Sequence, residues 1–457
     1  MSGAVTGPER TWTVGTAPGI FPFVSHAIAL FRRPLEFLNS LPQQGDLVEI
    51  RLGPMRAWVV CEPRLVHRML TDPHTFDKGG PLYDRLGALM GDGIVTCRQS
   101  EHRRQRQLLQ PGFHASRIAA YTELMAEEAL SLCDEWRPGR KVDVTAAMMA
   151  LTTRVTSRVL FSDSLDARRA AAVRESLAAV VRGLFVRTVV PVDAPFRIPT
   201  PANRRYRDAL ARLHTLIDSI IAERHRGAAR DDLLETLLAA VSDEPDGISE
   251  RAVHDQLITL LLTGVETTAM CLASAFGLLA SNPEAEHALH RELDALAPGP
   301  DGRPAPGPDA PAGLVYTRCV VTETLRLRPP GWLFTRVTTE ETELAGRRLP
   351  RGATVLYSPY LLHHDPESFP DPESFVPERW FPEWAASVPK GAMLPFSAGN
   401  RKCIGDSFAM AEATTALATI ARRWRLRPLS ARVREPRPAV TLGPRSLVMI
   451  CERRQRT

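Results

Sequence analysis

The sequence predicts a mainly α-helical protein with a small β portion, folded as one large domain. The strongest indication is the stretch between Ser249 and Ser281, which is apolar nearly all round. At about 31 residues, it has the pattern of a long helix that crosses the protein interior. Residues 116–136 and 203–225 carry apolar side chains at helical spacing. Residues 46–61 alternate apolar and polar side chains instead, which is typical of strands.

The β-rich N-terminal part is expected over about residues 40–65. Within it, "DLVEIRLGPMRAWVVC" (Asp46–Cys61) alternates around Gly53 and Pro54. Two alternating runs joined by such a turn predict a β-hairpin.

A helical body is expected over about residues 66–330. Ser249 is a favourable N-cap for the long helix, and Asn282-Pro283 is a favourable stop. The Pro/Gly-rich segment 297–312 predicts a surface loop and not a domain linker. Although the chain is long for a single core, we therefore assign residues 1–457 to one domain.

Composition excludes several classes of protein. The net charge of +5 is mild, and no dense Lys/Arg run indicates nucleic-acid binding. The seven cysteines are odd in number and form no C-x-x-C pair, which argues against a disulfide framework and a structural zinc site. The N-terminus lacks the pattern of a secretory signal, and the apolar stretch 19–31 is too short for a membrane span. We expect a cytoplasmic protein.

One cysteine stands in a distinctive setting, "PFSAGNRKCIGD" (Pro395–Asp406). Taken alone, Cys403 fits an inert core residue, half of a disulfide or a metal ligand. The complete pattern F-x-x-G-x-R-x-C-x-G favours the ligand. Its glycines permit a tight turn, and Arg401, the loop N–H groups and a helix beginning near Ile404 would stabilise a thiolate.

This pattern resembles the haem loop of the cytochromes P450, and the chain is similar to that family over nearly its full length. The resemblance implies the P450 fold, with a long central helix over haem b and a haem-binding loop at 395–406. It also implies that Cys403 is the axial ligand of the haem iron and that Phe396 lies beside the haem. The expected activity is that of a monooxygenase, an oxidoreductase that uses O2.

A second family mark is E-x-x-R at Glu323 and Arg326, 77 residues before Cys403 when counted from Arg326. The i, i+3 spacing puts both side chains on one helix face. With Arg379 in "VPERW", the resemblance implies a buried Glu–Arg–Arg network that fixes structure.

The centre of the long helix reads Thr263-Gly264-Val265-Glu266-Thr267-Thr268. It resembles the family's (A/G)-G-x-(D/E)-T-(T/S). Gly264 is expected to leave room over a planar cofactor. Glu266 and Thr267 are the expected catalytic pair, holding water and relaying protons toward dioxygen. Thr263 departs from the usual small residue; it would narrow the pocket or offer a hydrogen bond to substrate.

His102 and Arg106 lie four residues apart in "EHRRQRQLLQPGF", so they share a helix face. By resemblance they hold the haem propionates together with Arg336 and Arg401. Taken alone, His102 would be interpreted as a surface histidine.

The substrate pocket is sketched by resemblance from two apolar segments, 79–95 and 329–334. Few charges there indicate a small hydrophobic substrate, although each of these residues also fits core packing. The expected lining residues are Leu82, Leu86, Leu89, Met90, Thr263, Trp332, Leu333 and Phe334.

Four further stretches, 81–96, 188–206, 355–369 and 388–403, resemble the bacterial albaflavenone synthase subfamily. These enzymes oxidise the sesquiterpene epi-isozizaene through an alcohol to a ketone. P450 enzymes for fatty acids, steroids or macrolides are the alternative.

A member of that subfamily also has a Mg²⁺-dependent terpene synthase site, and the corresponding stretch here is Arg230–Gly247. Asp231 and Asp232 begin like the metal motif, but Glu235 and Ala239 stand where Ser/Thr and Glu are wanted. "SDEPD" (Ser242–Asp246) only roughly imitates D-D-x-x-D. Because Mg²⁺ needs several correctly placed oxygens, we expect no working synthase site.

No G-x-G-x-x-G follows a predicted strand, so no fused reductase domain is expected. The expected electron donor is an acidic ferredoxin with its ferredoxin reductase. It would dock on the cysteine side near Arg103, Arg104, Arg401 and Lys402. A haem-thiolate sensor is the non-catalytic alternative, but a sensor has no need of Glu266 and Thr267.

Overall fold

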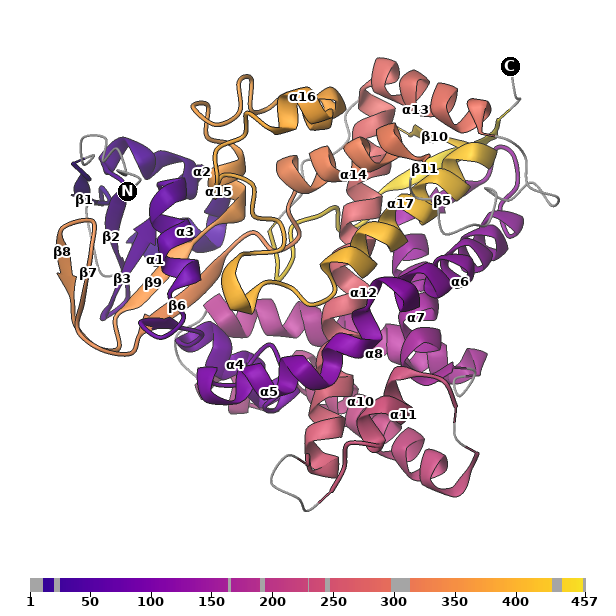
Figure 1. Ribbon diagram of the computed structural model, residues 1–457, viewed down its shortest axis with the longest axis horizontal. Helices are drawn as coiled ribbons and strands as arrows, with labels where there is room; N and C mark the ends of the chain where they lie inside the picture. The colour runs from indigo at the N-terminus through magenta and orange to yellow at the C-terminus, as the bar shows by residue number, and fades with distance from the viewer. Residues whose placement is uncertain are drawn as a thin grey trace, which may run out of the picture.

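The structure is a computed structural model, and it describes residues 11–19, 25–162, 166–189, 194–228, 230–242, 247–296, 313–429 and 438–454. Helices make up most of these residues, and a smaller β region gathers at one side of the molecule (Figure 1). The expected mainly α architecture is confirmed. The predicted loop at 297–312 lies outside the described residues.

The larger sheet has six strands in the order β1-β2-β3-β9-β6-β4. β2 and β3 form the predicted hairpin, with Leu47 opposite Val60 and Gly53 in the left-handed region of φ at +65°. The strands of this sheet are β1 (Val14–Thr16), β2 (Leu47–Leu52), β3 (Met55–Val60), β4 (Phe76–Asp77), β6 (Phe334–Thr338) and β9 (Thr354–Tyr357).

Two small sheets complete the β portion. A three-stranded sheet has the order β10-β11-β5, and a two-stranded sheet pairs β7 with β8. Their strands are β5 (Lys141–Asp143), β7 (Thr342–Leu344), β8 (Arg347–Leu349), β10 (Trp424–Pro428) and β11 (Val448–Arg453).

The helices fall into three groups along the chain. Those of the N-terminal part are α1 (Ser25–Arg32), α2 (Pro34–Ser40), α3 (Pro63–Thr71), α4 (Pro81–Met90) and α5 (Gln99–Leu109). The middle of the chain forms α6 (Ala115–Asp134), α7 (Val144–Phe161), α8 (Ala167–Val189), α9 (Ala194–Arg197), α10 (Pro201–Arg226) and α11 (Leu233–Leu238). The remaining helices are α12 (Glu250–Ser281), α13 (Pro283–Ala295), α14 (Val315–Leu327), α15 (Pro359–His363), α16 (Pro382–Ala385) and α17 (Asp406–Arg423).

The predicted long helix is α12, which runs through the helical region (Figure 1). Its N-cap is Ser249, whose hydroxyl accepts a hydrogen bond from the Ala252 N–H at 3.1 Å. Among the described helices, α12 alone is long and apolar enough to cross a bilayer, but 78% of its apolar stretch is buried inside the protein. Such extensive burial identifies α12 as a helix of the protein core.

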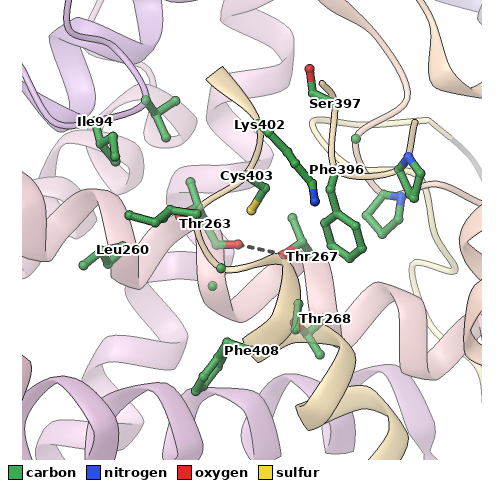
Figure 2. Close-up of a pocket in the computed structure, with 18 of the residues that line it drawn as sticks. Ile94, Leu260, Thr263, Thr267, Thr268, Phe396, Ser397, Lys402, Cys403 and Phe408 are labelled. Carbon is green, nitrogen blue, oxygen red and sulfur yellow. Dashed lines mark hydrogen bonds between the residues drawn. The ribbon is translucent and has the colours of Figure 1, made fainter. Parts of the chain in front are cut away.

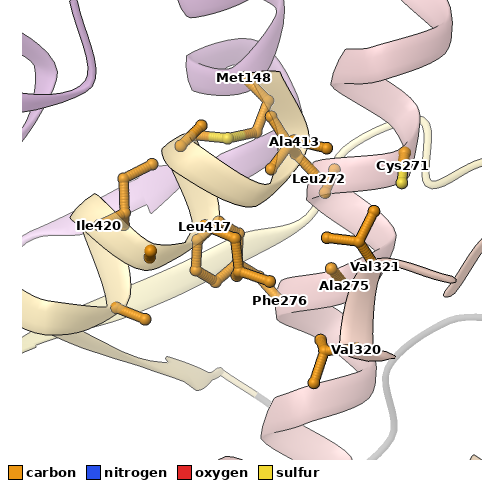
Figure 3. Packing of buried hydrophobic residues seen from close by; sticks show 14 of the residues in the cluster. Met148, Cys271, Leu272, Ala275, Phe276, Val320, Val321, Ala413, Leu417 and Ile420 are labelled. Atoms are coloured by element: carbon orange, nitrogen blue, oxygen red, sulfur yellow. The ribbon is translucent and has the colours of Figure 1, made fainter. Parts of the chain in front are cut away.

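The main hydrophobic core forms where α12 meets α7, α14 and α17. Figure 3 shows Phe276 of α12 beside Leu417 of α17, with Val320 of α14 close by. Because three long helices pack on α12, the centre of this helix is held at a fixed position in the molecule.

Candidate active site

A cavity of about 310 Å³ lies between the middle of α12 and the loop that precedes α17. Additional walls come from α5, α7 and β6. Figure 2 shows Thr263 and Thr267 on one side and Cys403 and Phe396 on the other. The structure therefore brings the predicted cysteine loop and the predicted central motif of α12 to the same cavity.

Cys403 presents its thiol to this cavity. The side chain is accessible but surrounded by protein, so its accessible face is turned inward. The Cys403 N–H donates to the Phe396 carbonyl at 3.0 Å, which closes the loop. Gly399 is required here, because its φ is +69° and a Cβ atom would lie 2.0 Å from the Leu70 carbonyl oxygen.

One of the contributions expected to stabilise a thiolate at Cys403, that of Arg401, differs in the structure. Burial raises the pKa of the Cys403 thiol, and the Gly405 N–H offsets only part of this rise. Arg401 does not turn toward the thiol; its Nη2 donates to Asp77 at 2.7 Å and its Nη1 to the Cys97 carbonyl at 3.0 Å. The following helix α17 begins at Asp406, two residues after the predicted start near Ile404.

On α12, the cavity-lining residues form one stripe at helical spacing. Thr267 donates its hydroxyl hydrogen to the Thr263 carbonyl at 2.7 Å, drawn as a dashed line in Figure 2. Thr263 in turn donates to the Thr259 carbonyl at 2.8 Å. Both hydroxyls are thus bonded back to their own helix, and each oxygen keeps its capacity to accept a hydrogen bond.

Gly264 lines the cavity, but a Cβ atom there would sit 3.5 Å from the Thr156 side chain, an ordinary contact. Sterics within the protein therefore do not demand glycine at this position, and α12 continues through it without interruption.

Glu266, in the middle of the same motif, is half-buried and does not line the cavity. Its carboxylate oxygen Oε1 accepts a hydrogen bond from the Thr441 hydroxyl at 2.7 Å. Burial raises the pKa of Glu266 to about 7, and the Thr441 hydrogen bond offsets part of the rise.

The four residues expected to hold propionates all line the cavity: His102, Arg106, Arg336 and Arg401. His102 is buried, and its pKa falls to about 3 because of burial and the nearby cations. Arg106 donates to the Lys402 carbonyl at 2.6 Å, which ties α5 to the cysteine loop.

The cytochrome P450 family model matches this chain over residues 16–451. The chain belongs to the cytochrome P450 family. Its expected fold is thereby confirmed, and so is its class as a monooxygenase, an oxidoreductase whose family implies haem.

Three relatives of this P450 come from Streptomyces. Cyclooctat-9-en-7-ol 5-monooxygenase of Streptomyces melanosporofaciens is 48% identical, covering 98% of this chain and 97% of the relative. Cyclooctatin synthase of the same organism is 47% identical, with 97% of each covered. Pentalenene oxygenase of Streptomyces avermitilis is 40% identical, with 92% of each covered.

The cavity of this P450 suits a haem by its chemistry. The lining combines apolar walls, one inward-facing thiol and a cluster of cationic side chains. These three features match the planar apolar ring, the iron and the two carboxylates of haem.

The predicted Glu–Arg–Arg network is present. Glu323 and Arg326 are fully buried and form a bidentate pair, with Nε to Oε2 at 2.9 Å and Nη2 to Oε1 at 2.8 Å. Arg379 lies farther away, with Nε 3.5 Å from Glu323 Oε1. Sequence inspection missed two further donors to Glu323, the Val376 N–H at 3.1 Å and Trp380 Nε1 at 2.8 Å.

Most of the expected substrate-pocket residues lie elsewhere. Thr263 and Phe334 line the cavity, but Leu82 does not, and Leu86, Leu89 and Met90 belong to the core in which α4 packs against α8 and α12. Two residues after Pro330 also lie away from the cavity. Trp332 and Leu333 pack in a core with α2 and β3.

The residues that line the cavity in their place include Ile94, Val95 and Leu260. Leu260 was within reach of sequence reasoning, because it precedes Thr263 by three and Gly264 by four residues on the same helix face. Ile94 and Val95 follow α4 in a segment without regular periodicity, so no pattern identified them.

In the stretch that corresponds to the Mg²⁺-dependent terpene synthase site, the first two acidic residues already form ion pairs within the protein. Asp232 caps α11 and forms a buried ion pair with Arg224 at 2.6 Å, and Asp231 pairs with Arg117. Within the described part of the chain, no group of three His, Cys, Asp or Glu side chains is arranged to hold a metal ion. Residues 243–246 of "SDEPD" lie outside the described residues.

Proposed function

We propose that this P450 hydroxylates a hydrophobic cyclic terpene and oxidises it further to a ketone. The observation that carries the proposal is the combination of an apolar cavity beside Cys403 with relatives named for terpene compounds, pentalenene and cyclooctat-9-en-7-ol. The specific candidate is the sesquiterpene epi-isozizaene. A fatty acid, steroid or macrolide is the alternative within the same chemistry.

In this proposal, haem b supplies the iron that activates O2, with the Cys403 thiolate as its protein ligand. His102, Arg106, Arg336 and Arg401 bind its carboxylates. The apolar side chains of Ile94, Leu260 and others exclude water from the substrate and hold it by contact, without polar selection.

The proposed proton relay uses Glu266 and Thr267. Because its pKa is about 7, Glu266 is partly protonated at neutral pH, and the protonated form can act as an acid. The carboxyl has to leave the Thr441 hydroxyl to donate toward the cavity. The Thr267 hydroxyl oxygen is placed to accept a proton or a water hydrogen bond there.

We expect turnover of the wild-type enzyme to fall as pH rises through about 7, since the protonated carboxyl is the active form. In Glu266→Gln, turnover should no longer fall as pH rises through this range. Thr267→Val should form about 10-fold less product per O2 consumed. Thr259→Val is the matched control, because Thr259 bonds back to the Asp255 carbonyl on the same helix but does not line the cavity. If Thr267→Val and Thr259→Val formed the same amount of product per O2 consumed, the proposed proton relay would be excluded.

Substrate choice is tested by titrating the purified ferric enzyme with candidate substrates and following the change of iron spin state in the absorption spectrum. We expect epi-isozizaene and pentalenene-type hydrocarbons to give the change at micromolar concentration, and products to appear with an electron-transfer system. If only fatty acids, steroids or macrolides changed the iron spin state, the assignment of a terpene substrate would be wrong.

We further propose that electrons come from a ferredoxin with its reductase, and that the enzyme works in the cytoplasm. Arg103 and Lys402 are exposed near the cysteine loop, Arg104 is half-buried, and Arg401 is buried and paired with Asp77. The docking surface is therefore reduced to Arg103, Arg104 and Lys402. Because exposed charges are screened by salt, the reduction rate should fall steeply between low and physiological ionic strength. A reduction rate independent of salt would contradict this docking surface.

A further inference from the structure

The segment that follows α4 forms part of the cavity wall and is held by α12. Ile94 and Val95 of this segment line the cavity. Two neighbouring side chains of α12 accept hydrogen bonds from its backbone: Asp255 Oδ2 from the Asp92 N–H at 3.0 Å, and Gln256 Oε1 from the Ile94 N–H at 3.1 Å. Both side chains are buried, and neither lines the cavity. They therefore act on the cavity only through the segment that they hold.

The fit between this segment and Asp255 is close. Gly91 has a φ of +66°, and a Cβ atom there would overlap the Asp255 carboxylate. Gln105 of α5 donates to the Asp92 carbonyl at 2.7 Å and accepts from Gln256 Nε2 at 3.0 Å. Because buried polar groups are costly to leave without partners, the position of the wall depends on this carboxylate staying in place.

Asp255 is in turn connected to α10 through two histidines. His254 Nδ1 lies 3.4 Å from Asp255 Oδ1, and His254 Nε2 lies 3.3 Å from His214 Nδ1. When both Nδ1 atoms carry a hydrogen and His254 Nε2 does not, His214 donates to His254, and His254 donates to Asp255. A continuous chain of hydrogen bonds then runs from α10 to the Asp92 N–H.

The charges around the two rings determine how protonation acts on this chain. Asp218 of α10 lies 3.4 Å from His254 Nε2, and Arg251 of α12 pairs with Asp255 at 3.1 Å. One added proton is accommodated, because the two facing nitrogens can share it beside the carboxylates. A second added proton places two positive rings against each other. Burial, His254 and Arg251 lower the pKa of His214, although Asp218 and Asp255 oppose this shift.

We propose that His214 is a positioning residue of the substrate cavity, which acts through His254 and Asp255 to hold the wall segment 91–95 against α12. When both imidazoles are protonated, they repel each other and His254 turns away, so that Asp255 is free to turn outward to the exposed Arg251. Because the pKa of His214 is lowered, the chain is intact at neutral and alkaline pH and is lost as pH falls through that pKa. The proposal rests on the proposed function only in treating the cavity as the substrate site.

The test uses the ferric, haem-loaded protein at about pH 7.5 and about pH 5.5, on either side of the ordinary pKa of histidine. Two quantities are measured: the dissociation constant of epi-isozizaene from the iron spin state, and amide hydrogen exchange of segment 91–95, corrected for the effect of pH on intrinsic exchange. At the lower pH we expect the wild type to bind about 10-fold more weakly and the segment to exchange about 10-fold faster, which corresponds to one unit of pKa.

His214→Gln separates this chain from a general effect of acid. Glutamine can still donate to His254 but does not titrate, so the variant should show the same affinity and the same exchange at both pH values. His225→Gln is the matched control, because His225 also joins α10 to α12, through Glu250 at 3.1 Å, but both side chains are exposed. It should respond to pH as the wild type does.

Exchange of segment 91–95 that does not change with pH in the wild type would overturn the proposal, and so would a His214→Gln variant that responds like the wild type. If His214→Gln does not fold, Asp255 decides. Asp255→Ala lacks the acceptor and should exchange fast in the segment at both pH values, whereas Asp255→Asn should stay protected at the higher pH; equal protection in the two would contradict the proposal. If epi-isozizaene changed the spin state at neither pH, the proposed substrate would be wrong, and the exchange measurement would still decide on His214.

Discussion

Replacing Glu323 by alanine is expected to lower the free energy of unfolding by about 3–5 kcal/mol, and the protein should retain little haem. Both oxygens of this fully buried carboxylate are engaged by Arg326, and the Val376 N–H and Trp380 also donate to it. Its removal would leave the Arg326 charge buried and only partly compensated by carbonyl groups.

The three carbonyls that accept from Arg326 belong to His363, Pro372 and Ser374, in segments far from α14 in the sequence. The pair therefore connects α14 to the chain that leads into the cysteine loop, and its loss should loosen the haem site as well as the fold. Urea unfolding and the haem content of purified protein measure the two effects.

Glu36→Ala is the matched control for this experiment. Glu36 also pairs with an arginine three positions away, but both Arg33 and Glu36 are exposed, and the distance is 3.5 Å. An exposed pair of this kind contributes at most about 1 kcal/mol. Similar losses of stability in the two variants would contradict the structural role assigned to Glu323.

The second large effect is expected at Cys403. Cys403→Ser should fold and bind haem through the cationic side chains of the cavity, but lose the thiolate spectrum and reduce terpene oxidation to background. Burial raises the pKa of the Cys403 thiol, and a serine hydroxyl is a far weaker acid still, so serine should not supply an anionic ligand.

The control is Cys61→Ser, because Cys61 is half-buried and does not line the cavity. It should keep the spectrum and the activity of the wild type. Full terpene oxidation by Cys403→Ser would show that the cysteine is not the ligand on which the chemistry depends.

The elements of the fold were largely predictable because their signals are local. The N-cap at Ser249, the apolar length of α12 and the alternation around Gly53 each reflect short-range preferences that the tertiary structure satisfies. The cavity-facing positions of Cys403, Phe396, Thr263 and Thr267 followed from motifs whose spacing is fixed by one loop and one helix.

The substrate side could not be predicted in the same way. Leu86, Leu89 and Met90 were expected in the pocket from their apolar character, but they lie in the core where α4 packs against α8 and α12. Trp332 is likewise apolar, yet its Nε1 donates to the Ala439 carbonyl at 3.0 Å, and the ring packs in a core. Apolar residues satisfy a core and a pocket equally well, so only the rotation of each element separates the two.

Charged residues were misjudged for a related reason. Arg401 was expected to face the redox partner as well as the haem, but it is buried, and its guanidinium pairs with Asp77, 324 positions away in the sequence. Lys78, next to that aspartate in the sequence, also lines the cavity and was overlooked, because no motif contains it. Long-range ion pairs of this kind leave no periodic signal in the chain.

The central claim is that Cys403 presents a thiolate to haem iron in the cavity beneath α12. The absorption spectrum of the reduced wild-type protein under carbon monoxide tests it most directly. We predict the red-shifted Soret band that is characteristic of thiolate-ligated haem. A band at the position of histidine-ligated haem in folded, haem-loaded protein, or no haem binding at all, would contradict the claim.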